Sequence, residues 1–230
     1  VRLTGVPLCF IPVGDFIASP PPKVNKKMEK RHPLDNLIQH AINLGVSDAK
    51  IVSVEEISVE DHLAKMCEEP QCDGYGQTIN CPPHVMKPDR FREYIGQYKL
   101  ALVFKLDVPT EILLTDERND VTRIIHETAA SIEQFAIDDG HANSKGLAAG
   151  SYKRIFCSGY DECRVLNEGG DCRFPNLARP SLSGLGINFF KLSKALGWQI
   201  NKITKNSNPD DVPMGMMAGI VLIGEGDLRQ

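Results

Sequence analysis

Residues 99–108 read KLALVFKLDV and decide the fold, because they form a near-continuous apolar run. A strand with both faces buried has this pattern, whereas a half-exposed strand alternates between apolar and polar residues. We therefore expect a buried central strand here, with the other elements arranged around it.

The segments before this strand show helix and strand periodicity in turn. Residues 33–44 carry apolar side chains at helical spacing, and Gly45 is suited to end that helix. The elements expected before the central strand are a helix at 33–44, a strand at 49–57, a short helix at 58–66 with Ser58 as a candidate cap, and a helix at 89–98.

The segments after it begin with a long amphipathic helix at 120–137, in which apolar residues recur every three or four positions. His126 on this helix is expected to face solvent or the edge of the core. The further elements expected are a strand within 146–156, helices at 181–186 and 189–196, and closing strands at 198–205 and 217–224.

These elements alternate, although not as strict βαβ units, and predict a single α/β or α+β domain over residues 33–230. We expect a mixed sheet flanked by helices, with two cysteine-rich loops meeting at one end. Residues 1–32 combine Pro20-Pro21-Pro22 with a basic run and are interpreted as an N-terminal extension or linker without assigned function. Cys9, in an apolar setting there, is interpreted as a packing residue.

Composition excludes several classes of protein. The 230 residues can bury a full core, and the formal charge of −4 gives no basic surplus for nucleic acid. The longest apolar run, 214–223, is too short to cross a membrane. Seven cysteines without a secretory signal predict a reducing, cytoplasmic setting, in which grouped cysteines serve metal or redox chemistry.

Six of the seven cysteines fall into two triplets with nearly equal spacing, which chance does not usually produce. In both triplets a Gly-, Asn- and Asp-rich loop fills the longer gap, and proline follows the last cysteine closely. We expect all six to be metal or cluster ligands. The triplets are Cys67-x4-Cys72-x8-Cys81-Pro82-Pro83 and Cys157-x5-Cys163-x8-Cys172-Arg173-Phe174-Pro175.

Thiolates are soft ligands, so a set made only of cysteines indicates zinc or an iron–sulfur cluster. Structural zinc usually takes closely spaced cysteine pairs, whereas wide loops with a Cys-Pro junction are commoner around clusters. The spacing therefore favours iron–sulfur, as one or two [4Fe–4S] clusters, with zinc as the alternative.

Six thiolates can be distributed in two ways. One cluster could bridge both triplets, or each triplet could hold its own cluster with one iron open to another ligand; the near-repeat favours the second. Candidates for that ligand are His84, Tyr160, Asp161 and Glu162, although His84 also fits a polar surface residue and Tyr160 an aromatic wall of the site.

Arg173 and Arg179 follow the second triplet closely. Two guanidinium groups there could offset the negative charge of a thiolate-ligated cluster, or hold an anionic substrate. Ordinary surface salt bridges are the other interpretation.

With these motifs in place, residues 35 to 225 resemble the predicted metal-binding proteins of domain of unknown function 2284. In that family the second block carries a Cys-x2-Cys-x2-Cys run and then Cys-Arg-x-Pro; here Cys157 and Cys163 match the outer positions of the run, and Tyr160 stands in the middle. The resemblance implies metal or iron–sulfur binding without supplying a reaction. It rests on the motifs Cys72-Asp73-Gly74-Tyr75-Gly76, Cys81-Pro82-Pro83, Cys172-Arg173-Phe174-Pro175, Arg179-Pro180-Ser181 and Gly186-Ile187.

Three functions remain open at this point. The first is an iron–sulfur protein that passes electrons to, or helps assemble, a redox partner protein. The second is an enzyme whose open iron acts on a small anionic substrate, and the third is a zinc-stapled interaction domain. Nucleic acid and membranes are not expected partners, and the sequence leaves homo-oligomers open.

Overall fold

The computed structural model describes residues 34–225, and the predicted central strand lies inside its sheet as β2 (Leu100–Pro109). The sheet has the strand order β1-β2-β4-β3, and its three strand pairs are antiparallel. The partners of β2 are β1 (Asp48–Ser53) and β4 (Met214–Ile223), and β3 (Lys145–Ala148) pairs with the far side of β4.

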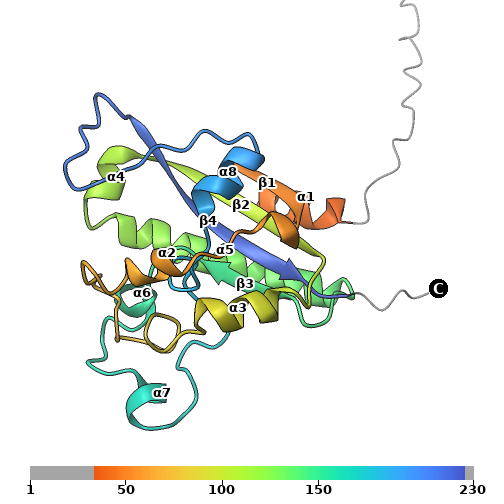
Figure 1. Ribbon diagram of the computed structural model, residues 1–230, viewed down its shortest axis with the longest axis horizontal. Coiled ribbons are helices and arrows are strands. Elements are labelled where there is room, and N and C mark those ends of the chain that lie inside the picture. The colour runs from red at the N-terminus through yellow and green to blue at the C-terminus, as the bar shows by residue number, and fades with distance from the viewer. Residues whose placement is uncertain (1–33, 226–230) are drawn as a thin grey trace, which may run out of the picture. The chain divides into compact units, whose positions relative to one another are not determined.

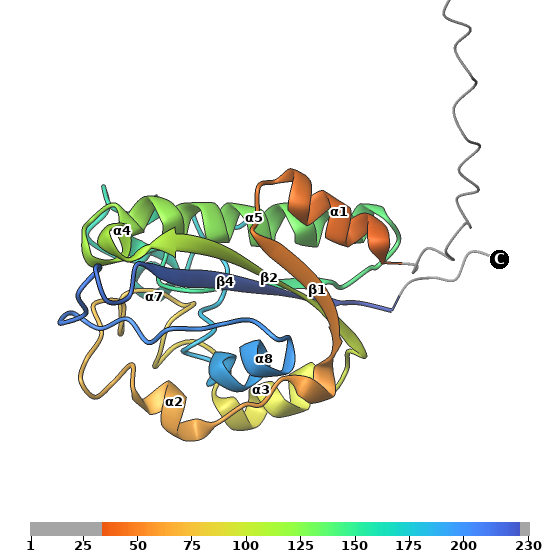
Figure 2. The ribbon, with the colours of Figure 1, turned by 90° about the horizontal axis from the view of Figure 1, so that it is seen from above.

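Helices cover both faces of this sheet, which explains the continuous apolar run in β2. One face packs against α1 (Asp35–Asn43) and the 21-residue α5 (Arg118–Asp138); α3 (Pro88–Ile95) and α8 (Phe189–Ala195) lie on the other face (Figure 2). Along β2, Leu102 and Phe104 belong to the core on the α5 side and Ala101 and Val103 to the core on the α8 side. Successive side chains of a strand point to opposite faces, so both sets must be apolar.

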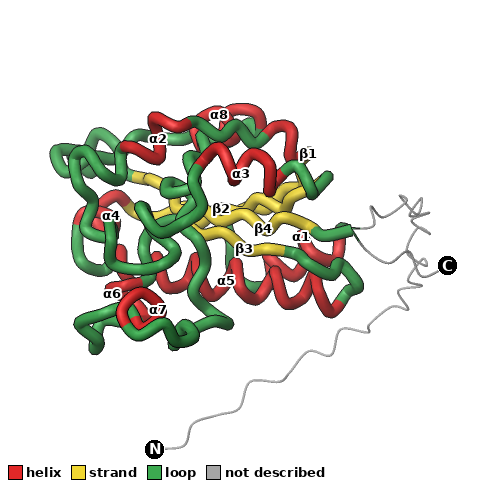
Figure 3. The backbone as a smooth tube through the Cα atoms, turned by 60° about the horizontal axis from the view of Figure 1, so that its bottom comes forward, coloured by secondary structure: helices red, strands yellow, loops and turns green. Residues whose placement is uncertain are grey.

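The remaining helices are short, and most lie in the connections at one end of the sheet, where β2 leads into α4 (Figure 3). They are α2 (Asp61–Lys65), α4 (Thr110–Leu114), α6 (Lys153–Phe156), α7 (Arg164–Asn167) and the 3-10 helix η1 (Val54–Glu56).

The expected fold class, a single domain of helices around a sheet, is confirmed. Because the three strand pairs are antiparallel, the fold is of the α+β class. It is not the mixed sheet that we expected. A parallel contact occurs in the isolated bridge between Ala148 and Ser181.

Two element boundaries were wrong in the first half of the chain. The strand expected at 49–57 ends at Ser53, because the Ser53 and Glu56 side chains form a capping box that starts η1. Ser58 does not cap a helix: its hydroxyl donates to the Glu60 carboxylate, and α2 begins after Glu60.

Three expectations were wrong in the second half. The strand expected within 146–156 ends at Ala148, and the helix expected at 181–186 is a series of turns, in which the Ser181 N–H donates to Asn80 O and Gly186 has φ +78°. Residues 198–205 form no strand; Trp198 instead packs in the core and donates to Asp48 Oδ2 at 2.7 Å.

The expected N-terminal extension at 1–32, including Cys9, lies outside the described residues. Among the helices between residues 34 and 225, none combines the length and apolar content needed to span a bilayer.

Candidate metal centre

The first cysteine loop, residues 67–83, follows α2 and folds as a series of tight turns. The Cys72 N–H donates to Cys67 O at 3.0 Å, and the Val85 N–H donates to Cys81 O at 2.9 Å. Cys67 and Cys81 are buried, whereas Cys72 is exposed. The loop thus holds two thiols inside the protein and presents one to solvent.

The three thiols of this loop influence one another. Burial, and then the neighbouring Cys72 and Cys81, raise the pKa of Cys67 to about 11. Burial also raises the pKa of Cys81, while the hydroxyls of Ser151 and Thr78 oppose that rise. Buried thiols with raised pKa carry their protons at neutral pH, so any metal here must displace protons.

The second cysteine loop, residues 157–175, follows α6 and contains α7. Cys157 and Cys163 are buried and Cys172 is half-buried. Burial, followed by the nearby Cys172, raises the pKa of Cys157, whereas Lys153 and Arg173 act in the opposite direction. The thiols of the second loop thus also influence one another, and the cations Lys153 and Arg173 lie near them.

Those two cations tie the second loop together. Lys153 Nζ donates to the carbonyl oxygens of Cys157 at 3.4 Å, of Tyr160, and of Asp161 at 3.1 Å. Arg173 donates to Glu162 O at 3.1 Å, pairs with Glu168 at 3.3 Å, and lies 4.3 Å above the Tyr160 ring. Arg173 therefore contacts Glu162, Glu168 and Tyr160 within the loop. These contacts are more than the single surface salt bridge that the sequence suggested.

The two loops meet at the start of α6 (Figure 1), as expected from the sequence. A Cβ atom at Gly74 would lie only 2.7 Å from Ser151 Cβ, so glycine allows this close approach. Thr78 and Tyr152 are each 1% exposed at the junction, close to one another. Within residues 34–225 neither hydroxyl completes a hydrogen bond of normal geometry.

Burial, and then the second-loop cysteines with Cys172 foremost, raise the pKa of Tyr152. Tyr152 and Thr78 are therefore buried donors beside thiols of both loops. Sequence reasoning missed them, because an isolated Thr or Tyr belongs to no ligand pattern.

The four candidates for an additional ligand lie on the surface of the loops. His84 is exposed and its N–H donates to Cys81 O at 3.0 Å; Asp161 and Glu162 are exposed, and Tyr160 is 45% exposed beneath Arg173. Their role as ligands stays a prediction.

Arg179 is not available to an anionic substrate. It is buried, its Nε lies 2.7 Å from Glu133 Oε2, and its Nη atoms donate to backbone carbonyls. Its own N–H donates to Nδ1 of His126 at 3.2 Å.

His126 is fully buried, whereas we expected it to face solvent or the edge of the core. Its ring packs edge-on against Tyr152 and Phe156, which lead into the second loop. Burial, followed by the charge of Arg179, lowers the pKa of His126 to about 4, so the ring is neutral at pH 7.

The donor chemistry fits a soft metal, with six thiols in two groups and the buried hydroxyls of Thr78 and Tyr152 between them. As the side chains stand, however, no three His, Cys, Asp or Glu groups in the described part of the chain are arranged to hold a metal ion. Each loop must therefore tighten when its thiols take up a metal.

Comparison with known proteins supports the same chemistry. No curated protein and no solved structure matches the chain. The profile of a family described as predicted metal-binding protein, domain of unknown function 2284, matches residues 50–223, a span that contains both cysteine loops. The chain belongs to this family of predicted metal-binding proteins.

Proposed function

We propose that this chain is an iron–sulfur protein that holds one cluster on each cysteine triplet and exchanges electrons with a redox partner protein in a reducing compartment. One observation carries the proposal: the thiol interactions that raise the cysteine pKa values run within each triplet, between Cys67, Cys72 and Cys81 and between Cys157, Cys163 and Cys172.

An iron–sulfur cluster supplies one-electron transfer when bound, and the protein tunes it through charge and hydrogen bonds near the sulfur atoms. Beside the second loop, Lys153 of α6 and Arg173 would offset the negative charge of the thiolates. Between the loops, the buried hydroxyls of Thr78 and Tyr152 would donate hydrogen bonds to sulfur.

Metal uptake would also order the loops. Because the thiols do not stand in a ready-made ligand geometry, part of the metal-binding free energy is used to bring them together, as in other small metal domains. We expect residues 67–83 and 157–175 to gain protection from hydrogen exchange when metal binds.

The enzyme alternative has a separate observation in its favour. Cys72 is the exposed thiol of its loop and lines a cavity, so an iron held there would lie near a binding site for a small molecule. Arg179, one of the two guides expected for an anionic substrate, is engaged elsewhere.

Metal analysis tests the proposal. Protein purified without oxygen should contain about eight irons and eight acid-labile sulfides per chain for two [4Fe–4S] clusters. About four irons would refute the two-site arrangement and leave one bridging cluster. Stoichiometric zinc without sulfide would overturn the iron–sulfur assignment and favour a zinc-stapled domain.

A further inference from the structure

A cleft with cationic walls adjoins the first cysteine loop. Its inner part is a cavity of about 290 Å³ lined by Cys72 and Asp73 of that loop and by Arg118, Lys153 and Arg154. A second cavity of about 850 Å³, which we call the outer part, shares Arg118 and Leu113 with it and is also lined by Asp116 and Lys205. A space of this size suits a small organic molecule.

The inner part carries more positive than negative charge. Arg154 Nη2 lies 3.1 Å and Arg118 Nη2 3.9 Å from the same Asp73 oxygen, so one carboxylate occupies the position between two guanidinium groups. Lys153 is bound by carbonyl oxygens, which leave its charge uncancelled. Arg118 and Arg154 are each about half exposed and can reach an incoming ligand.

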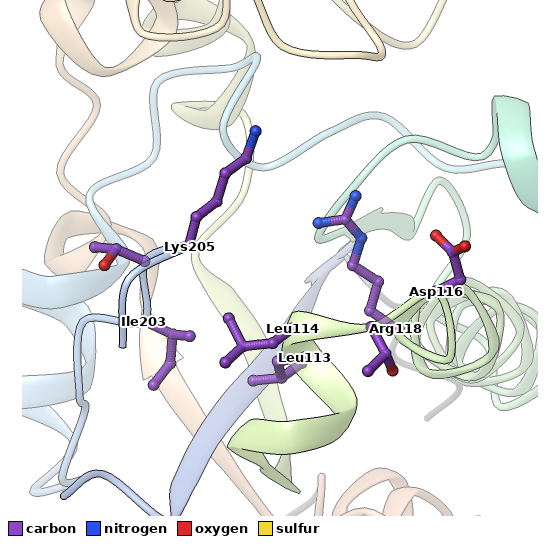
Figure 4. A pocket seen from close by; sticks show the side chains of 8 residues that line it. Leu113, Leu114, Asp116, Arg118, Ile203 and Lys205 are labelled. Atoms are coloured by element: carbon purple, nitrogen blue, oxygen red, sulfur yellow. The ribbon is translucent and has the colours of Figure 1, made fainter. Parts of the chain in front are cut away.

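The outer part has an apolar floor. Figure 4 shows Leu113, Leu114 and Ile203 beneath the charged ends of Arg118 and Lys205. A Cβ atom at Gly215 would lie 2.6 Å from Leu113 Cδ1 and 2.9 Å from Ile203 Cγ1, so this glycine lets both side chains pack onto β4.

We propose that this cleft binds an organic oxyanion. Its carboxylate or phosphate group replaces Asp73 between Arg118 and Arg154, since guanidinium groups match such groups with paired hydrogen bonds. Its apolar part lies over Leu114 and Ile203. Binding moves Asp73, the residue after Cys72, and so couples the ligand to the first loop. This inference goes beyond the proposed function and does not require a bound metal.

Titration calorimetry on the full chain as isolated tests the proposal, with phenyl phosphate, benzoate and inorganic phosphate as probes. Phenyl phosphate or benzoate should bind more tightly than inorganic phosphate, and the stronger of the two identifies the headgroup. Arg118→Gln and Arg154→Gln should each weaken binding about ten-fold. Asp73→Asn should tighten it, because a competing negative charge is removed.

Two further variants sharpen the result. Ile203→Ser should weaken the binding of the aromatic probes and leave inorganic phosphate unchanged. Arg90→Gln is the matched control, since Arg90 pairs with Glu93 on α3 and does not line either cavity. The proposal is overturned if no aromatic probe binds, or if both arginine variants bind like the unmodified chain.

The iron and sulfide contents of the same samples keep this test separate from that of the proposed function. Arg118→Gln and Arg154→Gln should retain the metal content of the unmodified chain while losing probe affinity. A chain purified without oxygen that contains no iron but still binds phenyl phosphate would refute the iron–sulfur assignment and support the cleft.

Discussion

The two cysteine loops have nearly the same ligand spacing but different electrostatic surroundings. Residues 67–83 contain no Lys or Arg, and the two arginines that reach the loop from outside, Arg118 and Arg154, are paired with its Asp73. The groups that favour ionisation of Cys81 are the hydroxyls of Ser151 and Thr78. At residues 157–175, Lys153 of α6, just before the loop, and Arg173 within it act on Cys157 and also tie the loop through its carbonyl oxygens.

This difference shows that equal spacing does not mean equal sites. A nearby cation stabilises a thiolate and offsets the charge of a bound cluster, whereas a neutral hydroxyl does so more weakly. We therefore expect the second loop to bind metal more tightly, and a cluster held there to be easier to reduce.

Cysteine replacement should give the largest effect. Cys81→Ser should remove the metal of the first loop and Cys157→Ser that of the second, so that each loses about half of the total iron, because each cluster depends on its own three thiols. Iron and sulfide analysis checks this, with Cys9→Ser as the control that keeps all of it. Near-complete loss from either single change would mean that one cluster bridges both loops.

Acidification should weaken metal binding at the first loop strongly. Cys67, with a pKa of about 11, and Cys81, with a raised pKa, are protonated at neutral pH, so the bound metal must displace both protons. Affinity should then fall at least about a hundred-fold per pH unit lowered, ten-fold for each of these two protons.

A variant with serine at Cys157, Cys163 and Cys172 isolates this site, and Co²⁺ competition against a chelator between about pH 8 and pH 6 measures it. The reverse variant, with serine at the first triplet, should bind more tightly at each pH. Equal affinities in the two variants would remove the proposed difference between the loops.

His126, which packs against the residues leading into the second loop, should make the stability of the folded chain sensitive to acid. Its pKa is about 4 in the folded protein and about 6.5 when unfolded, so between these values the unfolded chain binds a proton that the folded chain does not. This group should therefore reduce the free energy of unfolding by up to about 3 kcal/mol as pH falls from about 6.5 to 4.

Chemical denaturation across that pH range tests this effect. His126→Asn should be less stable at pH 7, because ring packing is lost, but its stability should fall less steeply with acid. Parallel pH profiles for the two proteins would show that His126 does not titrate as described.

Removing the cation beside Cys157 should give the smallest effect. Lys153→Gln should weaken metal binding at the second loop about three- to ten-fold, because the site is partly exposed and its interactions are screened. Lys99→Gln, an exposed lysine paired with Glu225, is the control. An unchanged affinity would mean that loop geometry outweighs the charge of Lys153.

Elements with strong periodicity were predictable from the sequence. The apolar run of β2 and the amphipathic pattern of α5 identified both within a few residues. The segment 198–205 has strand-like residues but forms no strand, and its Trp198 packs in the core and donates to Asp48. The local residue pattern does not predict this tertiary packing of Trp198.

The candidate site also has a part that the sequence predicts and a part that it does not. Spacing alone divided the six cysteines between two loops, and their role as ligands stays a prediction, whereas the residues around them come from distant parts of the chain. Arg118, at the start of α5, reaches Asp73 of the first loop, and Tyr152 reaches Thr78. Such contacts form only when the sheet has folded, so a local sequence motif does not predict them.

The position of β4 in the sheet has a consequence for synthesis of the protein. β3, which leads toward the second loop, pairs with β4, and β4 is the last strand described. At about 5–20 residues per second, the ribosome needs roughly 3–10 s to advance from Cys172 to Ile223. Throughout that interval all six thiols have been made while the strand that anchors β3 has not. Cluster insertion is therefore expected only after β4 has been made, and a nascent chain that meets an oxidant before then would cross-link its cysteines instead.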